Sequence, residues 1–186
     1  MVVFYKTKRS GVKKPFRLEE IWRIRTRLEI ENNLMQLTLL NLAIDSKLRA
    51  SDLLSLRIFD VSSQDRIFNR VKHIQRKTDI EVQFEITTRT QQSLMKWILM
   101  ASLHDSNFIF PSQRRNDNEV QRSEGSNIRK VTLHSMRRTK ATLVYAKTKN
   151  IRAVQLLLGH TKVDNTIRYL GVELEDALLL SEGTEC

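Results

Sequence analysis

The stretch LMQLTLLNLAID, residues 34–45, is apolar on most of its helical faces. A helix with apolar side chains all round its surface is one that other elements surround. We therefore expect residues 34–45 to form the central helix of the fold. A chain of 186 residues can bury a substantial core around such a helix but is too short for two full-sized domains, so we expect one domain.

Segments with helical periodicity flank this central stretch on both sides. In the first of them, Leu18, Ile21, Trp22 and Leu28 lie on one side of a helix that is otherwise charged. The expected helices cover residues 18–33, 49–57, 88–103, 134–149, 151–158 and 164–170. Most of the chain is therefore expected to be helical.

The period changes from helical to alternating between the helices expected at 49–57 and 88–103. Ile80, Val82 and Phe84 alternate with charged or polar residues, which predicts a half-buried strand. The preceding RIFNRVKHI, residues 66–74, predicts its partner strand, with a turn around residues 76–79. The predicted fold class is mainly α with a small antiparallel β-sheet, an α+β domain.

Three stretches lie outside this regular pattern. Residues 1–17 are basic without an acidic residue, and Gly11 and Pro15 interrupt them, so they predict a flexible basic arm. Residues 111–130 carry few large apolar side chains, so they predict a loop or a disordered excursion. Near the end, LEDALLL predicts a short amphipathic helix before a polar tail, within residues 173–186.

The composition points to a polyanionic partner. The chain has 32 lysines and arginines against 21 acidic residues, a net charge of +11, which favours nucleic acid, although a scattered surplus of charge is the alternative. Cys186, the single cysteine, excludes an internal disulfide framework, and four scattered histidines argue against a structural zinc site. Without an apolar run of spanning length or a signal peptide, we expect no membrane association and a cytoplasmic location.

Two arginines and a histidine could form an anion site. His134 and Arg137 are three residues apart, which places both side chains over one helical face. Together they could hold a tetrahedral anion, but a capped helix with solvated Arg137 and Arg138 explains the same residues. Arg49 opens a helix, where a positive charge opposes the helix dipole, so we expect another role for it.

Tyr169 follows a turn that carries a second histidine. Gly159 is a suitable C-terminal cap for the helix 151–158, Asp164 a plausible cap for the next helix, and His160 lies on the turn between them. A phenol with a pKa of about 10 is a poor nucleophile near neutral pH unless cations or a base lie beside it. From its pattern alone, Tyr169 is either a core aromatic or a nucleophile.

Taken together, five elements in fixed order resemble the catalytic domain of the tyrosine recombinases, the phage integrase family. The elements are Leu48-Arg49-Ala50-Ser51-Asp52-Leu53, Lys77-Thr78, His134-Ser135-Met136-Arg137, Leu158-Gly159-His160 and Thr166-Ile167-Arg168-Tyr169. The resemblance extends over residues 18–172 and implies the fold of that catalytic domain. This sequence departs from the family pattern at Lys47, where the family usually has glycine, at Arg138, where it often has histidine, and at 111–130, where it normally has a helix.

The resemblance implies a site-specific DNA recombinase or integrase that breaks and rejoins DNA through a 3′-phosphotyrosyl link. Tyr169 would be the nucleophile, and Arg49 and Arg137 would clamp the non-bridging phosphate oxygens. Lys77 would be the general acid for the leaving 5′-oxygen.

Two histidines complete the catalytic set that the resemblance implies. His160 would hydrogen-bond the phosphate, and His134 would position or deprotonate the tyrosine. No cofactor is implied, because one phosphodiester is exchanged for another and the two arginines replace a metal. The alternatives are a nicking-closing enzyme like the type IB topoisomerases and a catalytically inactive DNA-binding accessory protein. The intact set of six residues argues against the inactive protein.

The implied partners are double-stranded DNA and further copies of the chain. The family acts as a tetramer on paired DNA sites, so we expect a homotetramer on DNA, whereas the free protein could be a monomer. The resemblance also implies a bacterial protein that is associated with the nucleoid. The family's usual core-binding domain is not expected before the catalytic domain, because only residues 1–17 precede it. The apolar face of residues 174–180 is expected either to contact a neighbouring protomer or to pack on its own domain.

Overall fold

The computed structural model describes residues 14–64, 66–111 and 125–171, with side chains from residue 133 onward in the last range. Its elements are α1 (Leu18–Ile30), α2 (Leu34–Ser46), α3 (Ala50–Leu54), α4 (Ile58–Val61), β1 (Ser62–Ser63), β2 (Arg66–Ile67), β3 (Arg70–Ile74), β4 (Glu81–Glu85), α5 (Thr88–Met100), α6 (Gly125–Thr148), α7 (Ile151–Leu158) and α8 (Val163–Leu170). Residues 1–13 of the predicted basic arm and the predicted C-terminal helix lie outside these ranges. None of the helices in the described ranges is both long enough and apolar enough to span a membrane.

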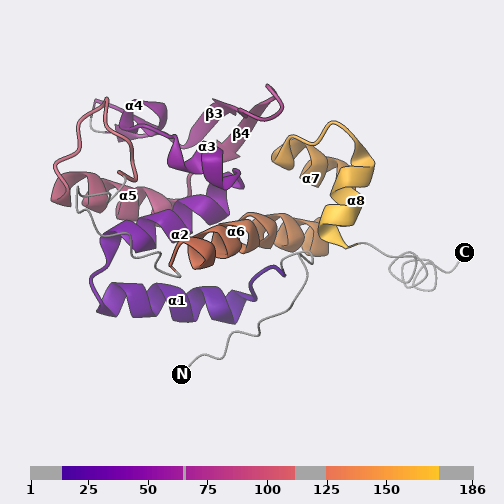
Figure 1. The fold of residues 1–186 in the computed structure, drawn as a ribbon, viewed down its shortest axis with the longest axis horizontal. Coiled ribbons are helices and arrows are strands. Elements are labelled where there is room, and N and C mark those ends of the chain that lie inside the picture. The colour runs from indigo at the N-terminus through magenta and orange to yellow at the C-terminus, as the bar shows by residue number, and fades with distance from the viewer. Residues whose placement is uncertain (1–13, 65, 112–124, 172–186) are drawn as a thin grey trace, which may run out of the picture.

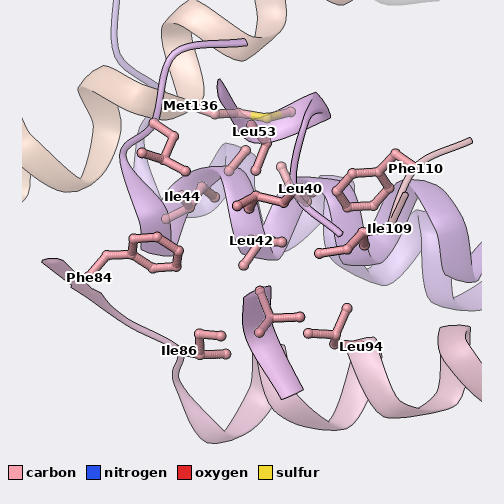
Figure 2. Packing of buried hydrophobic residues seen from close by; sticks show 14 of the residues in the cluster. Leu40, Leu42, Ile44, Leu53, Phe84, Ile86, Leu94, Ile109, Phe110 and Met136 are labelled. Carbon is pink, nitrogen blue, oxygen red and sulfur yellow. The ribbon is translucent and has the colours of Figure 1, made fainter. Parts of the chain in front are cut away.

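Helix α2 is the centre of the domain, as the sequence predicts. Helices α1, α5 and α6 and strand β4 all contact it (Figure 1). Figure 2 shows Leu40, Leu42 and Ile44 of α2 among the other buried side chains of the core. Leu42 is fully buried, which is the position expected for a residue of a helix without a polar face.

The predicted hairpin is confirmed as β3 and β4, which pair antiparallel with Val71 opposite Phe84 and His73 opposite Val82. Val71, Val82 and Phe84 are buried, and Phe84 points into the core (Figure 2). The fold class is therefore mainly helical with small antiparallel sheets. A second sheet of two short strands, β1 and β2, precedes the hairpin, so that RIFNRVKHI contains parts of two sheets.

Helix α1 buries a narrower face than the sequence predicts. Ile21 and Leu28 are buried, but Trp22 is 50% exposed and Leu18 is 55% exposed. The guanidinium groups of Arg25 and Arg89 lie 5.6 and 4.6 Å from the centroid of the Trp22 ring. Such cation–π contacts stabilise an aromatic ring at the surface, which explains why Trp22 does not need to enter the core.

Two predicted boundaries in the C-terminal half are wrong. Helix α6 begins at Gly125, so the loop predicted over residues 111–130 is contradicted for residues 125–130. A helix held in the core by Leu133 and Met136 can extend by one hydrogen bond per residue without a new nucleus, even where the sequence lacks an apolar period. Helix α8 begins at Val163 with Lys162 as its N-cap, so Asp164 lies in the first turn, where its charge favours the helix dipole, and is not the cap.

A buried carboxylate of α2 joins this helix to two others. Asp45 is 4% exposed, and its Oδ2 accepts hydrogen bonds from the backbone N of Thr87 (3.0 Å) and from the hydroxyls of Thr87 (2.7 Å) and Thr90 (2.6 Å). Its Oδ1 accepts one from Lys140 Nζ at 3.1 Å. The carboxylate therefore fixes the N-terminus of α5 and the middle of α6 against the end of α2.

Lys47, where the sequence departs from the family's glycine, ends α2 in the left-handed conformation with φ 55°. The side chain is 1% exposed, and Nζ donates to the backbone oxygen of Asp45 (2.6 Å) and to Glu85 Oε2 (3.3 Å). Glu85 also forms an ion pair with Lys140 at 2.9 Å. The left-handed backbone at this position favours glycine. A lysine is accommodated here, and its buried ammonium group is stabilised by acceptors inside the domain.

We predict that Asp45→Ala lowers the free energy of unfolding by about 3–5 kcal/mol, because the Thr87 N–H and the hydroxyls of Thr87 and Thr90 lose their acceptor and Lys140 keeps only Glu85 as its partner. Urea denaturation measures this loss. Glu31→Ala, which removes an exposed carboxylate paired with Arg27, is the control and should cost less than about 0.5 kcal/mol. Equal losses in the two variants would contradict the structural role of Asp45.

Candidate active site

Arg49 stands at the start of α3 and is held there by its neighbours. It is the N-cap of the helix in extended conformation, and the flanking Leu48 and Leu53 are buried at 3% and 1% exposure. Its Nη1 donates a hydrogen bond to Gln75 Oε1. The helix start therefore directs this half-buried guanidinium toward the end of β3, away from solvent.

Arg137 is the most deeply buried charged group of the site. It is 3% exposed, and Nη2 donates to the backbone oxygen of Leu158 at 3.0 Å. Nε and Nη1 have no hydrogen-bond partner among the described residues. Burial, together with the charge of Arg49, lowers the pKa of Arg137 from its usual value, although an arginine stays protonated in such surroundings. Arg137 therefore presents a charge and unused donors to a ligand.

The turn between α7 and α8 receives hydrogen bonds from two sides. The Leu158 oxygen accepts from Arg137 and also from Gln75 Nε2, at 3.0 Å in both cases. Gly159 follows with φ +65°, as a C-terminal cap in the left-handed region. Gln155 Nε2 then donates to the backbone oxygen of His160 at 2.9 Å. The turn is thus tied to α6, to the hairpin and to its own helix.

His160 is held as a neutral imidazole. Its Nδ1 lies 3.0 Å from the hydroxyl of Thr166, a fully buried residue of α8. Burial, with the charges of Arg137 and Arg49, lowers the pKa of His160 from 6.5 to about 4. At neutral pH the ring is therefore an uncharged hydrogen-bonding group.

Tyr169 packs within a group of aromatic and cationic side chains. Its ring meets the His160 ring edge to face, with centroids 5.5 Å apart. The guanidinium carbons of Arg138 and Arg137 lie 4.9 and 6.0 Å from the ring centroid. Against α6 and α7 the ring packs on a small apolar cluster around Leu158.

The hydroxyl of Tyr169 is buried and has no hydrogen-bond partner within the described part of the chain. Burial raises the pKa of the phenol above its usual value, and Arg137 and Arg138 oppose this rise only in part. The phenol is therefore protonated at neutral pH. Tyr169 is both a core aromatic and a candidate nucleophile, so the two readings of the sequence describe the same side chain.

The structure brings four of the six predicted site residues together. The charges of Arg49 and Arg137 act on the pKa values of His160 and Tyr169, and the His160 and Tyr169 rings are in contact. Lys77 is exposed on the turn between β3 and β4 and makes no hydrogen bond or ion pair with another described residue. His134 is also exposed, one turn before Arg137 on α6.

The structure adds residues to the site that the sequence did not reveal. Gln75 is 1% exposed and bridges Arg49 to the α7–α8 turn, yet its position at the end of an alternating strand gives no signal of this. The sequence suggests for Arg138 a departure from the family pattern or a solvated side chain, and the second interpretation is wrong for both Arg137 and Arg138, which are 3% and 7% exposed. The Arg138 guanidinium lies over the Tyr169 ring. Thr166 was visible only as part of the tyrosine motif.

The site has the electrostatic character of an anion pocket. Within the described ranges, Arg49, Arg137 and Arg138 form no ion pair with a carboxylate. Unpaired guanidinium donors beside a buried hydroxyl suit a tetrahedral anion with several oxygens. The arrangement can bind a phosphate and place a phenol beside it.

Gly159 offers a test of how tightly the turn fits. A Cβ there would lie 2.6 Å from Val82 Cγ1 and 2.9 Å from Gln75 Nε2, whereas nothing lies within 4 Å of a Cβ at Gly171, which has a similar φ of +72°. We predict that Gly171→Ala costs about 1–2 kcal/mol of stability from its left-handed backbone alone. Gly159→Ala should cost about 1–3 kcal/mol more, because the added methyl group displaces its neighbours.

Urea denaturation of the two alanine variants measures this difference. Equal losses would mean that the hairpin does not approach the turn as closely as the structure indicates. The comparison is matched, since the two glycines end consecutive helices in the same backbone conformation.

The depressed pKa of His160 predicts a pH dependence of stability. Between about pH 6.5 and 4, the unfolded chain takes up a proton on His160 that the folded chain does not, so the free energy of unfolding falls as the pH falls through this range. We expect His160→Gln to show a shallower fall than the unmodified chain in urea titrations across this range. Identical slopes would show that His160 binds its proton equally well in both states.

Comparisons with known proteins agree with this geometry. The model of the phage integrase family matches residues 15–175. A curated relative, the probable integrase/recombinase YoeC of Bacillus subtilis (strain 168), is 25% identical over 165 residues, which cover 84% of this chain and 87% of that protein.

Solved structures of recombinases share the fold. The XerA recombinase superposes with a TM-score of 0.66 and 20% sequence identity over 92% of this chain. The Tn1549 transposon integrase, in complex with transposon right end DNA, superposes with a TM-score of 0.69 and 15% sequence identity over 93% of this chain. The match covers 65% of the XerA chain and 66% of the Tn1549 integrase chain in these structures, so this chain spans less than two thirds of either. With a family model that matches nearly all of the described residues and a site that gathers the family's arginines, histidine and tyrosine, the chain belongs to the phage integrase family.

Proposed function

We propose that this chain is a site-specific DNA recombinase, which breaks and rejoins DNA through a covalent 3′-phosphotyrosyl intermediate. One observation carries the proposal. The Nε and Nη1 groups of Arg137 and the hydroxyl of Tyr169 are buried, close together and without hydrogen-bond partners in the described part of the chain. Leaving buried polar groups unpaired is unfavourable, and a phosphodiester would supply acceptors for these donors.

Each residue of the site takes one part in the proposed reaction. The Oη atom of Tyr169 attacks phosphorus, and the bond from phosphorus to the 5′-oxygen breaks as the new ester bond forms. Arg49 and Arg137 hold the non-bridging oxygens, where negative charge increases in the transition state. Lys77 donates a proton to the leaving 5′-oxygen, for which the β3–β4 turn must bring its exposed ammonium group to the phosphate.

The histidines have different parts in this scheme. His160 donates a hydrogen bond to a phosphate oxygen from its one ring N–H, as a neutral ring, which its pKa of about 4 supports. His134 positions or deprotonates the phenol of Tyr169. In the reverse direction a free 5′-hydroxyl attacks the phosphotyrosyl bond and releases the phenol, so that rejoining needs no nucleotide.

The proposed substrate is double-stranded DNA. The net charge of +11 supports a polyanionic partner, and the Tn1549 integrase with the same fold is bound to transposon DNA in its structure. We propose that residues 18–172 form the catalytic unit, and that four copies assemble on a pair of sites for strand exchange. Much of the affinity would come from phosphate contacts and would fall as the salt concentration rises.

A trapping experiment tests the nucleophile. We predict that the protein forms a covalent adduct with members of a library of nicked duplexes that have a randomised core, because loss of the fragment beyond the nick prevents rejoining. Tyr169→Phe should abolish the adduct, measured as DNA that remains attached to denatured protein. Sequencing the trapped DNA identifies the site.

Tyr145→Phe is the matched control. Tyr145 packs in the same apolar cluster and has the Lys149 ammonium group 5.6 Å from its ring, so this variant also removes a phenol hydroxyl near a cation. It should form the adduct at the unmodified rate. An undiminished adduct in Tyr169→Phe would move the nucleophile to Tyr145 or Tyr5 and contradict the assignment.

A further inference from the structure

Gln75 lies between the two arginines of the site without belonging to any of the recognised motifs. We propose that Gln75 is a positioning residue, which holds Arg49 at a fixed place relative to Arg137 before the phosphate enters. The effect of Gln75 on catalysis rests on the proposed function. That Gln75 holds Arg49 in place rests only on the contacts of the Gln75 side chain.

The amide of Gln75 can have only one orientation. Arginine has donors and no acceptor, so the atom that faces Arg49 Nη1 must be the amide oxygen. The backbone oxygen of Leu158 is an acceptor, so the atom 3.0 Å from it must be the amide nitrogen. A carboxylate could not donate to Leu158 and an ammonium group could not accept from Arg49, so this place requires an amide.

The contacts of Gln75 connect the two guanidinium groups. The Leu158 oxygen that accepts from Gln75 Nε2 also accepts from Arg137 Nη2 at 3.0 Å. A continuous series of hydrogen bonds thus runs from Arg49 through the amide and one carbonyl to Arg137. The spacing of two groups that bind one phosphate is therefore set by the protein itself, which is the condition for catalysis by preorganised charges.

Gln75 is one of the two side chains that leave no room for a Cβ at Gly159, with Val82 as the other. A Cβ at Gly159 would approach Gln75 Nε2 to 2.9 Å, so a larger residue would displace the amide from the Leu158 oxygen. The backbone of Gln75 also forms the hairpin turn, since its oxygen accepts from the N–H groups of Thr78 (3.2 Å) and Asp79 (2.8 Å). The side chain is thus fixed at both ends and cannot rotate away without losing buried hydrogen bonds.

The variant that tests the proposal is Gln75→Met, which keeps the length of the side chain and removes both hydrogen-bonding groups. Gln83→Met is the matched control, because Gln83 is an exposed residue of the same hairpin, on β4. With saturating DNA of the trapped sequence, we expect the rate of adduct formation to fall about 10- to 100-fold in Gln75→Met and to be unchanged in Gln83→Met. Affinity for that DNA, measured in the Tyr169→Phe background, should stay within about threefold, since most of it comes from phosphate contacts elsewhere.

A modified substrate separates Arg49 from Lys77. A duplex with sulfur in place of the bridging 5′-oxygen has a leaving group that needs no proton, so a defect caused by a displaced Lys77 would disappear with it. We expect the defect of Gln75→Met to persist, because Arg49 must clamp the phosphate in both substrates. If Gln75→Met recovered the full rate on the sulfur substrate, the proposal would be overturned, and the role of Gln75 would be to hold the hairpin turn that carries Lys77. A rate within twofold of the unmodified protein on ordinary DNA would also overturn it.

A measurement without DNA tests the structural part. NMR relaxation of the Arg49 side-chain nitrogen, assigned by its loss in Arg49→Lys, should show a rigid group in the unmodified protein and in Gln83→Met, and a mobile one in Gln75→Met. An equally rigid Arg49 in Gln75→Met would overturn the inference even if activity fell. If the unmodified protein forms no adduct, the proposed function fails, whereas the NMR comparison still decides whether Gln75 holds Arg49.

Discussion

The site depends on one backbone carbonyl, the oxygen of Leu158. It accepts hydrogen bonds from Arg137 on α6 and from Gln75 at the end of β3, and so joins three segments that are distant in the sequence. The carbonyl is available because α7 ends immediately after it, in the left-handed turn at Gly159. The Leu-Gly-His sequence is therefore as much a junction between elements as a carrier of His160.

Lysines pair with two carboxylates of the central helix and the hairpin. Lys140 binds the buried Asp45 and the partly exposed Glu85, and Lys47 also binds Glu85. Asp52 is fully buried, and its charge acts on Arg137 without forming an ion pair with it. Lys140 lies one turn after Arg137 on α6, so the same helix supplies a cation for the carboxylates and a cation for the site. Among the described residues no carboxylate forms an ion pair with Arg49 or Arg137, so both guanidinium groups can bind an anion from outside the protein.

The sequence predicts the central helix, the hairpin and the set of motif residues, because apolar periodicity and fixed spacings are local signals. It fails where the determining contact is distant. The start of α6 at Gly125 follows from packing further along the helix, and Gln75 becomes important only when α7 is folded beside the hairpin. No pattern within a strand indicates that one polar residue will meet a carbonyl 83 positions away.

The proton of Tyr169 is the remaining chemical question, and the pKa values restrict its answer. Burial keeps the phenol protonated at neutral pH, so a base must accept its proton during the attack. His160 touches the ring but has a pKa of about 4, which makes it a weak base and suits it to hydrogen bonding with the phosphate. His134 lies one turn before Arg137 on α6, and the proposed mechanism leaves to it the positioning or the deprotonation of the phenol.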